Sequence, residues 1–188
     1  MEQNALSLPA LEKKAGALAA QLVASLRSRG KTVAAAESCT GGLFAKYITD
    51  IPGSSAVLDG SVVTYANRIK TQFCGVEEET LRTCGAVSEP VARQMACGIR
   101  ACIGADFGIG ITGLAGPGGA SAEKPVGLVY LGCADAARCT VLSRITVPPD
   151  EYDPVSARAY VRTASVCAAM ELLLGMLADK GENRERSF

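Results

Sequence analysis

The sequence predicts a single-domain α/β fold. A chain of 188 residues with 48% apolar and 20% charged residues has the length and composition of one globular domain with a full hydrophobic core. Two apolar runs, residues 32–36 and 107–112, are too short for helices and lead into glycine-containing turns, as buried strands do. Apolar residues recur at helical spacing around these runs, and strands that alternate with helices are typical of the α/β class.

The charge balance and the absence of targeting signals limit the partners. Lys and Arg number 19, as do Asp and Glu, so the formal net charge is zero and no basic surface is indicated for nucleic acid or an acidic membrane. No apolar run approaches the length of a membrane span, and the N-terminus has neither a basic lead nor an apolar signal core. We therefore expect a cytoplasmic protein that binds neither nucleic acid nor membranes.

The chain contains eight cysteines and no histidine. Without histidine or a C-x-x-C pair a zinc site is not expected, and we expect most cysteines to be reduced and buried. The lack of histidine also excludes Ser-His-Asp hydrolases, Cys-His proteases and histidine-ligated metalloenzymes. A nucleophilic serine here would need lysine as its base, because burial or a neighbouring cation can lower the pKa of a lysine enough for that role.

The first predicted element is a packing helix. Residues 1–9 are expected to form a flexible leader, and leucines at helical spacing predict a helix over residues 10–29. Gly30, which follows two arginines, is a typical stop signal.

The next element is the strand over residues 32–37, which enters the turn Ser38-Cys39-Thr40-Gly41-Gly42. Ser38 thus stands at a strand end, where α/β sheets present reactive side chains. Gly41 and Gly42 lack a Cβ, so a ligand can approach their backbone, and the free N–H groups of the following helix attract anions. The alternative is that Ser38 or Thr40 only caps that helix.

A second strand, over residues 58–66, is predicted to pass through Tyr65 and to turn at Asn67 into a helix that carries Lys70 in its first turn. A lysine at such a position is normally a solvated surface residue. A short acidic helix follows within residues 75–84, and Ser88 with Pro90 marks the start of the next helix.

The strand over residues 107–112 leads into a second glycine-rich loop, Gly113 to Gly119. Two such loops after strands would form a pocket, although a flexible surface turn gives the same pattern. A hairpin is predicted from residues 127–132 and 140–147. The last helix is expected over residues 153–177, and the charged tail of residues 179–188 is expected to fray.

Six sequence blocks, in order along the chain, resemble the CinA C-terminal domain family. They are Ala36–Gly42, Pro52–Ser55, Val63–Asn67 with Lys70, Gly85–Ser88, Thr112–Pro117 and Lys124–Gly127. The resemblance implies a three-layer α/β/α sandwich with a central, largely parallel or mixed sheet over residues 10–178. The family's N-terminal nucleotide-processing domain has no counterpart in this sequence, so the similarity is to its stand-alone members.

The resemblance also implies a reaction, the hydrolysis of the carboxamide of nicotinamide mononucleotide (NMN) to nicotinic acid mononucleotide and ammonia, without metal or cofactor. The family mechanism assigns Ser38 as the nucleophile and Lys70 as the base, with Tyr65 positioning or relaying. This assignment agrees with the absence of histidine. An acyl-enzyme on Ser38 would follow, and we expect its oxyanion to be held by backbone N–H groups of Cys39, Thr40, Gly41 and Gly42.

The 5′-phosphate of the substrate needs an anion site. The loop residues Thr112, Gly113, Ala115 and Gly116 are one candidate and Arg158 is another. Family members often show Gly-Asp-Arg where this chain has Ser156-Ala157-Arg158, so the arginine is kept while its lead-in is not. Glu37 is expected either to orient Lys70 or the ribose, or to cap a neighbouring helix.

Two other functions are consistent with the sequence. One is a catalytically silent nucleotide-binding paralogue with a regulatory role in competence or DNA damage, but the joint presence of Ser38, Tyr65 and Lys70 favours an enzyme. The other uses Cys39 as a redox or nucleophilic thiol, but that thiol has no histidine partner. An apolar-rich domain of this family is expected to self-associate, most simply as a dimer.

Overall fold

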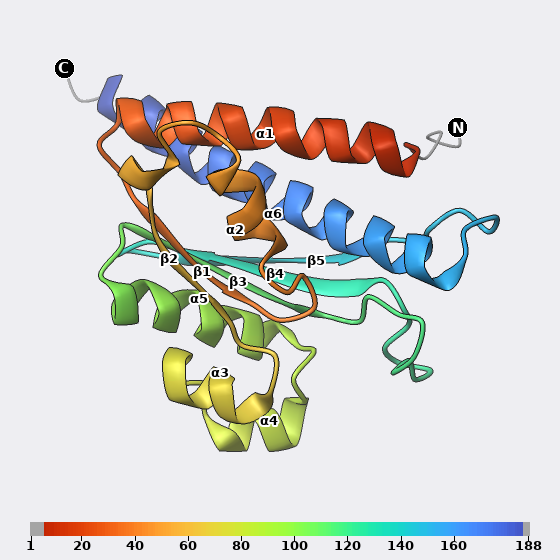
Figure 1. Cartoon of the computed structure of the whole chain (residues 1–188). Coiled ribbons are helices and arrows are strands. Elements are labelled where there is room, and N and C mark those ends of the chain that lie inside the picture. The colour runs from red at the N-terminus through yellow and green to blue at the C-terminus, as the bar shows by residue number, and fades with distance from the viewer. Residues whose placement is uncertain (1–5, 186–188) are drawn as a thin grey trace.

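The computed structural model describes residues 6–185 of the chain, and side chains up to Asp179. A five-stranded sheet lies between two layers of helices (Figure 1), which confirms the predicted α/β sandwich. Residues 1–5 of the predicted leader and residues 186–188 of the predicted tail lie outside the described residues. The strands are β1 (Val33–Glu37), β2 (Leu58–Val63), β3 (Phe107–Gly113), β4 (Leu128–Ala134) and β5 (Cys139–Ile145).

The sheet is mixed, with strand order β2-β1-β3-β4-β5. Strand β1 runs parallel to its two neighbours β2 and β3, whereas β3, β4 and β5 are successively antiparallel. The predicted hairpin is therefore confirmed. Because β1, β2 and β3 run in the same direction, their carboxyl ends meet at one edge of the sheet, where the segments after Glu37, Val63 and Gly113 become neighbours.

Helices cover both faces of the sheet. Figure 1 shows α1, α2 and α6 on one face and α3, α4 and α5 on the other. The helices are α1 (Leu8–Ser28), α2 (Leu43–Thr49), α3 (Asn67–Cys74), α4 (Glu78–Cys84), α5 (Glu89–Ile103) and α6 (Pro154–Glu185), and a short 3₁₀ turn covers Ser54–Ala56.

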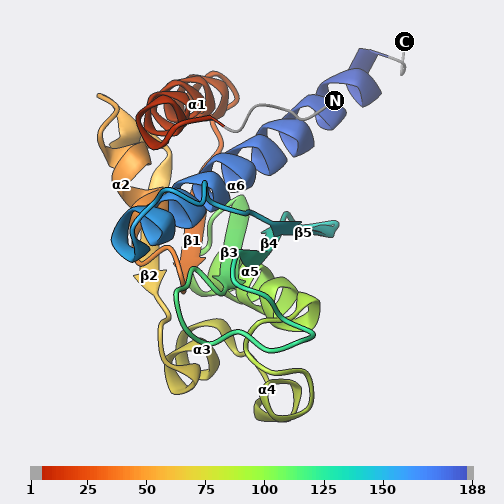
Figure 2. The same cartoon turned by 90° about the vertical axis from the view of Figure 1, so that its right-hand side faces the viewer.

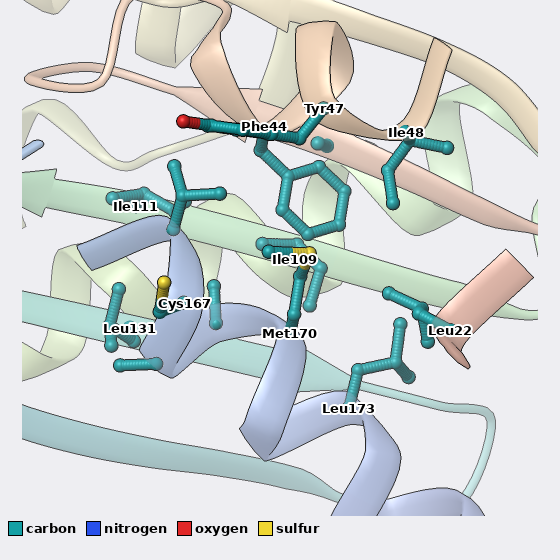
Figure 3. Packing of buried hydrophobic residues seen from close by; sticks show 14 of the residues in the cluster. Leu22, Phe44, Tyr47, Ile48, Ile109, Ile111, Leu131, Cys167, Met170 and Leu173 are labelled. Carbon is teal, nitrogen blue, oxygen red and sulfur yellow. The ribbon is translucent and has the colours of Figure 1, made fainter. Parts of the chain in front are cut away.

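The two faces are packed differently because β3 alternates isoleucine and glycine. Ile109 and Ile111 point to the α1/α6 face, where Figure 3 shows them beside Phe44 of α2 and Met170 of α6. Gly108 lies on the opposite face, where an added Cβ would lie 2.1 Å from the carbonyl oxygen of Ala96 in α5. The glycine side of β3 thus lets α5 lie directly on the sheet, while the isoleucine side fills the main core.

Three predicted boundaries were wrong. Helix α1 begins at Leu8, two residues before the predicted start, because Pro9 is accommodated in a first helical turn. Strand β2 ends at Val63 rather than Ala66, so Tyr65 lies in the connection to α3. Helix α6 continues to Glu185, beyond the predicted end at Leu177, so the tail is helical over most of its length.

Among residues 6–185, one helix has the length and apolar composition of a membrane span. It is the Pro154–Asp179 part of α6, with a mean hydropathy of 1.5 in its most apolar window. This finding corrects the expectation that no apolar run approaches that length. However, 61% of the window is buried inside the fold, so its apolar character is explained by its place against the sheet and α1.

Candidate active site

Ser38 and Lys70 meet at the carboxyl edge of the sheet. Ser38 directly follows β1, and its N–H donates to the carbonyl of Ile111 in β3 at 2.9 Å, which fixes the start of the turn. Lys70 lies in α3, the helix that follows the neighbouring strand β2. Its Nζ lies 3.1 Å from Ser38 Oγ. The parallel pairing of β1 and β2 thus brings together two side chains that are 32 residues apart in sequence.

Lys70 is not the solvated residue that its position in a short helix would normally give. Its side chain is only 1% exposed, and Nζ donates to the carbonyls of Thr64 at 2.7 Å and Tyr65 at 3.1 Å. Burial lowers the pKa of Lys70 below its ordinary value of 10.5, against a smaller opposing effect of the nearby thiols of Cys39 and Cys74. A neutral amine has two N–H bonds for the two carbonyls and one lone pair, which is left for the hydroxyl of Ser38. The surroundings therefore suit a general base.

A cavity of about 240 Å³ opens over Ser38 and Lys70. Its lining residues come from the turn after β1, from α3 and from the loop after β3. This loop extends from the same end of the sheet (Figures 1 and 2). The predicted site residues that line the cavity are Ser38, Cys39, Tyr65, Lys70, Thr112, Gly113, Ala115, Gly116 and Arg158. A larger hollow of about 790 Å³ lies at the opposite end of β3, around Phe107 and Arg100, but it contains no serine–lysine pair, since its Lys31 is paired with Asp106 at 2.6 Å.

Glu37 does not reach the cavity, because its carboxylate caps α2. The side chain is fully buried. Oε2 accepts from the N–H groups of Gly42 at 3.1 Å and Phe44 at 3.0 Å, while Oε1 accepts from the N–H of Ala45 at 3.0 Å and the hydroxyl of Ser61 at 3.2 Å. These contacts support helix capping as the role of Glu37. They do not support the alternatives, in which Glu37 orients Lys70 or the ribose of the substrate.

The same turn corrects the expected set of oxyanion donors. The N–H of Gly41 donates to the carbonyl of Ser38 at 3.1 Å, and the N–H of Gly42 is taken by Glu37. Thr40 has a fully buried side chain, and its carbonyl accepts from Arg162 at 2.7 Å. In the described part of the chain, the N–H groups of Cys39 and Thr40 have no backbone acceptor, and of these two residues Cys39 lines the cavity. These two N–H groups are therefore the candidates for an oxyanion site.

Arg158 joins the two sides of the cavity. Its Nη1 donates to the carbonyl of Gly116 at 2.6 Å, and its Nη2 donates to the hydroxyl of Tyr65 at 3.3 Å. The backbone carbonyl of Tyr65 accepts from Lys70, and the residue, which is 62% exposed, lines the cavity. In the lead-in to Arg158, Asp153 caps the start of α6 by accepting from the N–H groups of Val155 and Ser156 and from the hydroxyl of Ser156.

The side chain of Thr112 is less available than expected, because its hydroxyl donates to the carbonyl of Ala86 at 2.7 Å and the residue is 1% exposed. This bond holds the end of β3 against the connector that leads to α5. Gly113, Ala115 and Gly116 line the cavity, so the loop contributes mainly through its backbone. The phosphate prediction therefore depends on this backbone and on Arg158.

The cysteines do not support a thiol-based site. Burial raises the pKa of Cys39 to about 11, so its thiol is protonated at neutral pH and is a weak nucleophile. All eight cysteines are free, and half of them are buried, so the expectation that most are buried was wrong. The buried ones are Cys39, Cys74, Cys133 and Cys167.

Sequence reasoning missed Arg162 and Asn67. Asn67 lines the cavity at the start of α3, and Arg162 contacts the turn after β1. The available signal for Arg162 was its spacing, since a residue four positions after Arg158 lies on the same face of a helix.

The sequence of this chain is similar to those of known proteins. The sequence profile of the CinA C-terminal domain matches residues 15–177. A CinA-like protein from Desulfovibrio desulfuricans is 49% identical over 158 residues, which are 83% of this chain but 36% of that protein. A nicotinamide-nucleotide amidohydrolase PncC from Enterobacter agglomerans is 51% identical over 123 residues, which are 65% of this chain and 75% of that protein. The chain thus spans about a third of the length of CinA-like relatives such as the first one.

Solved structures show the same fold. The competence/damage inducible protein CihA from Agrobacterium tumefaciens matches with a TM-score of 0.78 and 43% identity, covering 86% of this chain and 94% of that chain. A CinA superfamily protein from Klebsiella pneumoniae matches with a TM-score of 0.80 and 30% identity, covering 88% and 98%.

Proposed function

The chain belongs to the CinA C-terminal domain family, and we propose that it is a serine–lysine amidohydrolase that converts NMN and water to nicotinic acid mononucleotide and ammonia. The observation that carries this proposal is the contact of 3.1 Å between Lys70 Nζ and Ser38 Oγ in a chain without histidine. The amidohydrolase name of a relative that is 51% identical supports the choice of substrate. We place the activity in the cytoplasm, because free thiols persist in a reducing compartment.

The first half-reaction acylates Ser38. The neutral amine of Lys70 accepts the hydroxyl proton as Oγ attacks the carboxamide carbon, and the N–H groups of Cys39 and Thr40 donate to the oxygen that becomes negative. Lys70, now an ammonium, returns the proton to the leaving nitrogen. Ammonia departs and a nicotinoyl ester remains on Ser38.

The second half-reaction reverses these roles with water. Lys70 is neutral again after ammonia leaves, so it can take a proton from a water molecule that attacks the ester carbon. Collapse of the second tetrahedral intermediate breaks the bond to Oγ, and Lys70 returns the proton to Ser38. One water is consumed and one carboxylic acid is formed in each turnover.

Recognition of the nucleotide falls to the far wall of the cavity. Arg158 carries the positive charge for a phosphate, and the backbone of Gly113 and Gly116 allows a close approach. A phosphate bound there would compete with the carbonyl of Gly116 and the hydroxyl of Tyr65 for the guanidinium of Arg158. The side of the cavity near Ser38 would then receive the carboxamide.

Ammonia release from NMN by the full chain, in the presence of a chelator, tests this proposal. Ser38→Ala and Lys70→Ala should each lower kcat/KM by about 10³-fold while the protein stays folded. Lys46→Ala is the matched control, because Lys46 is an exposed lysine paired with Asp50, and it should keep full activity.

Three outcomes would overturn parts of the proposal. A wild-type chain that binds NMN but releases no ammonia would replace the enzyme with the nucleotide-binding paralogue. Full activity in Lys70→Ala would show that Lys70 is not the base that activates Ser38. Activity lost in chelator and restored by a metal ion would replace the metal-free mechanism.

A further inference from the structure

Arg162 contacts the turn that carries the nucleophile, although it lies 122 residues away in sequence. Its Nη2 donates to the carbonyl of Thr40 at 2.7 Å. A Cβ built on Gly41 would lie 3.6 Å from the same nitrogen, so the guanidinium lies directly against the turn. Arg162 stands one helical turn after Arg158 on α6; Arg158 lines the cavity, and Arg162 contacts the turn beside it.

The contact holds one particular peptide group. The carbonyl of Thr40 and the N–H of Gly41 belong to the same trans peptide plane and point in opposite directions. The N–H end donates to the carbonyl of Ser38 at 3.1 Å, and the carbonyl end accepts from Arg162 and, at 3.2 Å, from the N–H of Leu43. This plane is therefore fixed at both ends.

Such a plane needs to be held, because the residues after it favour no single orientation. Gly41 and Gly42 adopt φ values of +59° and +93°, and glycine occupies positive and negative φ with similar ease. The peptide planes that carry the N–H groups of Cys39 and Thr40 directly precede this plane and are joined to it through Thr40 Cα, so a backbone that is loose at Thr40 would also leave those groups less well placed. Those two groups are the donors that the proposed reaction assigns to its oxyanion.

The charge of Arg162 has no local structural explanation. Among residues 6–179, Arg162 takes part in no ion pair, and its Nε is buried without a hydrogen-bond partner. Arg162 is half-buried, and partly removing a cation from water to bind a neutral carbonyl costs free energy that an apolar residue would avoid. Its field reaches the turn: burial raises the pKa of Cys39, and the guanidinium groups of Arg158 and Arg162 oppose that rise.

We infer that Arg162 is a positioning residue for the proposed amidase reaction: by holding the Thr40 carbonyl it aims the N–H groups of Cys39 and Thr40 at the developing oxyanion. The inference rests on the proposed function and assigns Arg162 a role different from that of Arg158. Arg158 acts on substrate binding, and Arg162 acts on the transition state.

Steady-state kinetics with NMN separate these roles. Arg162→Gln should lower kcat by about 10²-fold with KM changed by less than about threefold, as expected for lost oxyanion stabilisation. Arg158→Gln should mainly raise KM. Arg162→Lys keeps the charge and one donor, so its kcat should lie between those of wild type and Arg162→Gln. The pH at which kcat/KM levels off should not move in either Arg162 variant, because Lys70 is untouched.

A second readout avoids NMN altogether. A fluorophosphonate probe forms a bond from Ser38 Oγ to phosphorus and releases fluoride, and it needs the nucleophile, the base and the oxyanion donors but no nucleotide recognition. The labelling rate should fall in Arg162→Gln by about the same factor as kcat. Arg138→Gln is the matched control, since Arg138 contacts the far end of α6 through Asp179 at 2.8 Å, and it should label like wild type.

These outcomes keep the two proposals apart. Labelling of Ser38 without ammonia release from NMN would overturn the proposal that NMN is the substrate. The labelling rates of the Arg162 variants would still test the inference in that case. Wild-type labelling and turnover in Arg162→Gln, an effect on KM alone, or a shifted pH profile would overturn the role of Arg162. If Arg162→Gln fails to fold, Arg162→Lys decides, and full kcat in that folded variant would contradict the inference. Absence of both labelling and turnover in wild type would overturn both proposals.

Discussion

Two glycine-containing segments leave the sheet at its carboxyl edge, and they are held in opposite ways. The turn of residues 38–42 follows β1 and is fixed by Ile111, Glu37 and Arg162. The loop of residues 114–127 follows β3, and its middle part, residues 117–123, is exposed. Arg158 holds this loop at Gly116, and Lys124 holds it by donating to the carbonyl of Cys84 at 2.8 Å.

The difference indicates a division of labour within one cavity. Reacting atoms need positions fixed to a fraction of an ångström, and the short turn is held in place by hydrogen bonds to Ile111, Glu37 and Arg162. Recognition of a flexible nucleotide tolerates more movement, and the longer loop lines the cavity mainly with backbone. If this division is correct, changes in the turn should act on kcat and stability, and changes in the loop should act on KM.

Glu37→Gln gives the largest expected effect in the turn. The new amide group would direct N–H bonds at N–H donors that now share a carboxylate, so we expect a loss of about 1–3 kcal/mol in the free energy of unfolding and at least a tenfold fall in kcat. Chemical denaturation and turnover of NMN measure the two. Glu151→Gln, at an exposed carboxylate, should change neither. A variant at Glu37 with normal stability and kcat would show that the carboxylate does not hold the turn.

The next largest effect is the change of kcat/KM and of stability with pH as Lys70 loses its proton. Only its neutral amine can accept the proton of Ser38, so kcat/KM should rise about tenfold per pH unit and level off below pH 10.5. Because the pKa of Lys70 is lower in the folded chain than in the unfolded chain, the unfolded chain binds more protons between the two values, and stability should rise with pH across that window. The unfolding free energy of wild type minus that of Lys70→Met, measured against pH, isolates this contribution. A flat difference would mean that the pKa of Lys70 is not lowered.

The sequence predicted the site from its covalent neighbours and missed what depends on distant ones. Ser38 was readable because strand ends can be recognised locally, whereas Lys70 was assigned through the family resemblance, since its position alone indicated a solvated surface residue; the parallel pairing of β1 and β2 brings the two together. The end of β2 was missed because the carbonyls of Thr64 and Tyr65 bond to Lys70. The role of Arg162 depends on a contact across most of the chain, for which helical spacing gives only a direction.

The isoleucine and glycine alternation in β3 was readable but was taken only as an apolar strand. Its period of two shows which side of the strand admits a helix backbone, as the contact of Gly108 with Ala96 makes clear. Glu37 illustrates the opposite case. Its type and position allowed three roles, and only the folded turn, with donors converging from Gly42 to Ala45, selects one.

A matched pair of alanine substitutions sharpens the comparison without touching any side chain. Gly42→Ala meets only Val63 Cγ2 at 3.6 Å, so its cost is the strain of a φ of +93°, about 1–2 kcal/mol. Gly118→Ala has no atom within 4 Å and no positive φ, so it should be neutral or slightly stabilising. Denaturant unfolding of both variants measures the difference. Equal stabilities would show that the turn is no more constrained than the loop.

Lys124→Met gives the smallest expected effect and addresses the loop alone. It removes the bond to the carbonyl of Cys84, which is made by a half-exposed ammonium, so stability should fall by less than about 1 kcal/mol. A looser loop should raise KM for NMN a few-fold and leave kcat unchanged, because neither Ser38 nor its donors depend on Lys124. Lys13→Met, at an exposed position of α1, is the control for loss of a lysine charge. A fall in kcat at constant KM would mean that the loop also shapes the transition state, and the division between the two segments would fail.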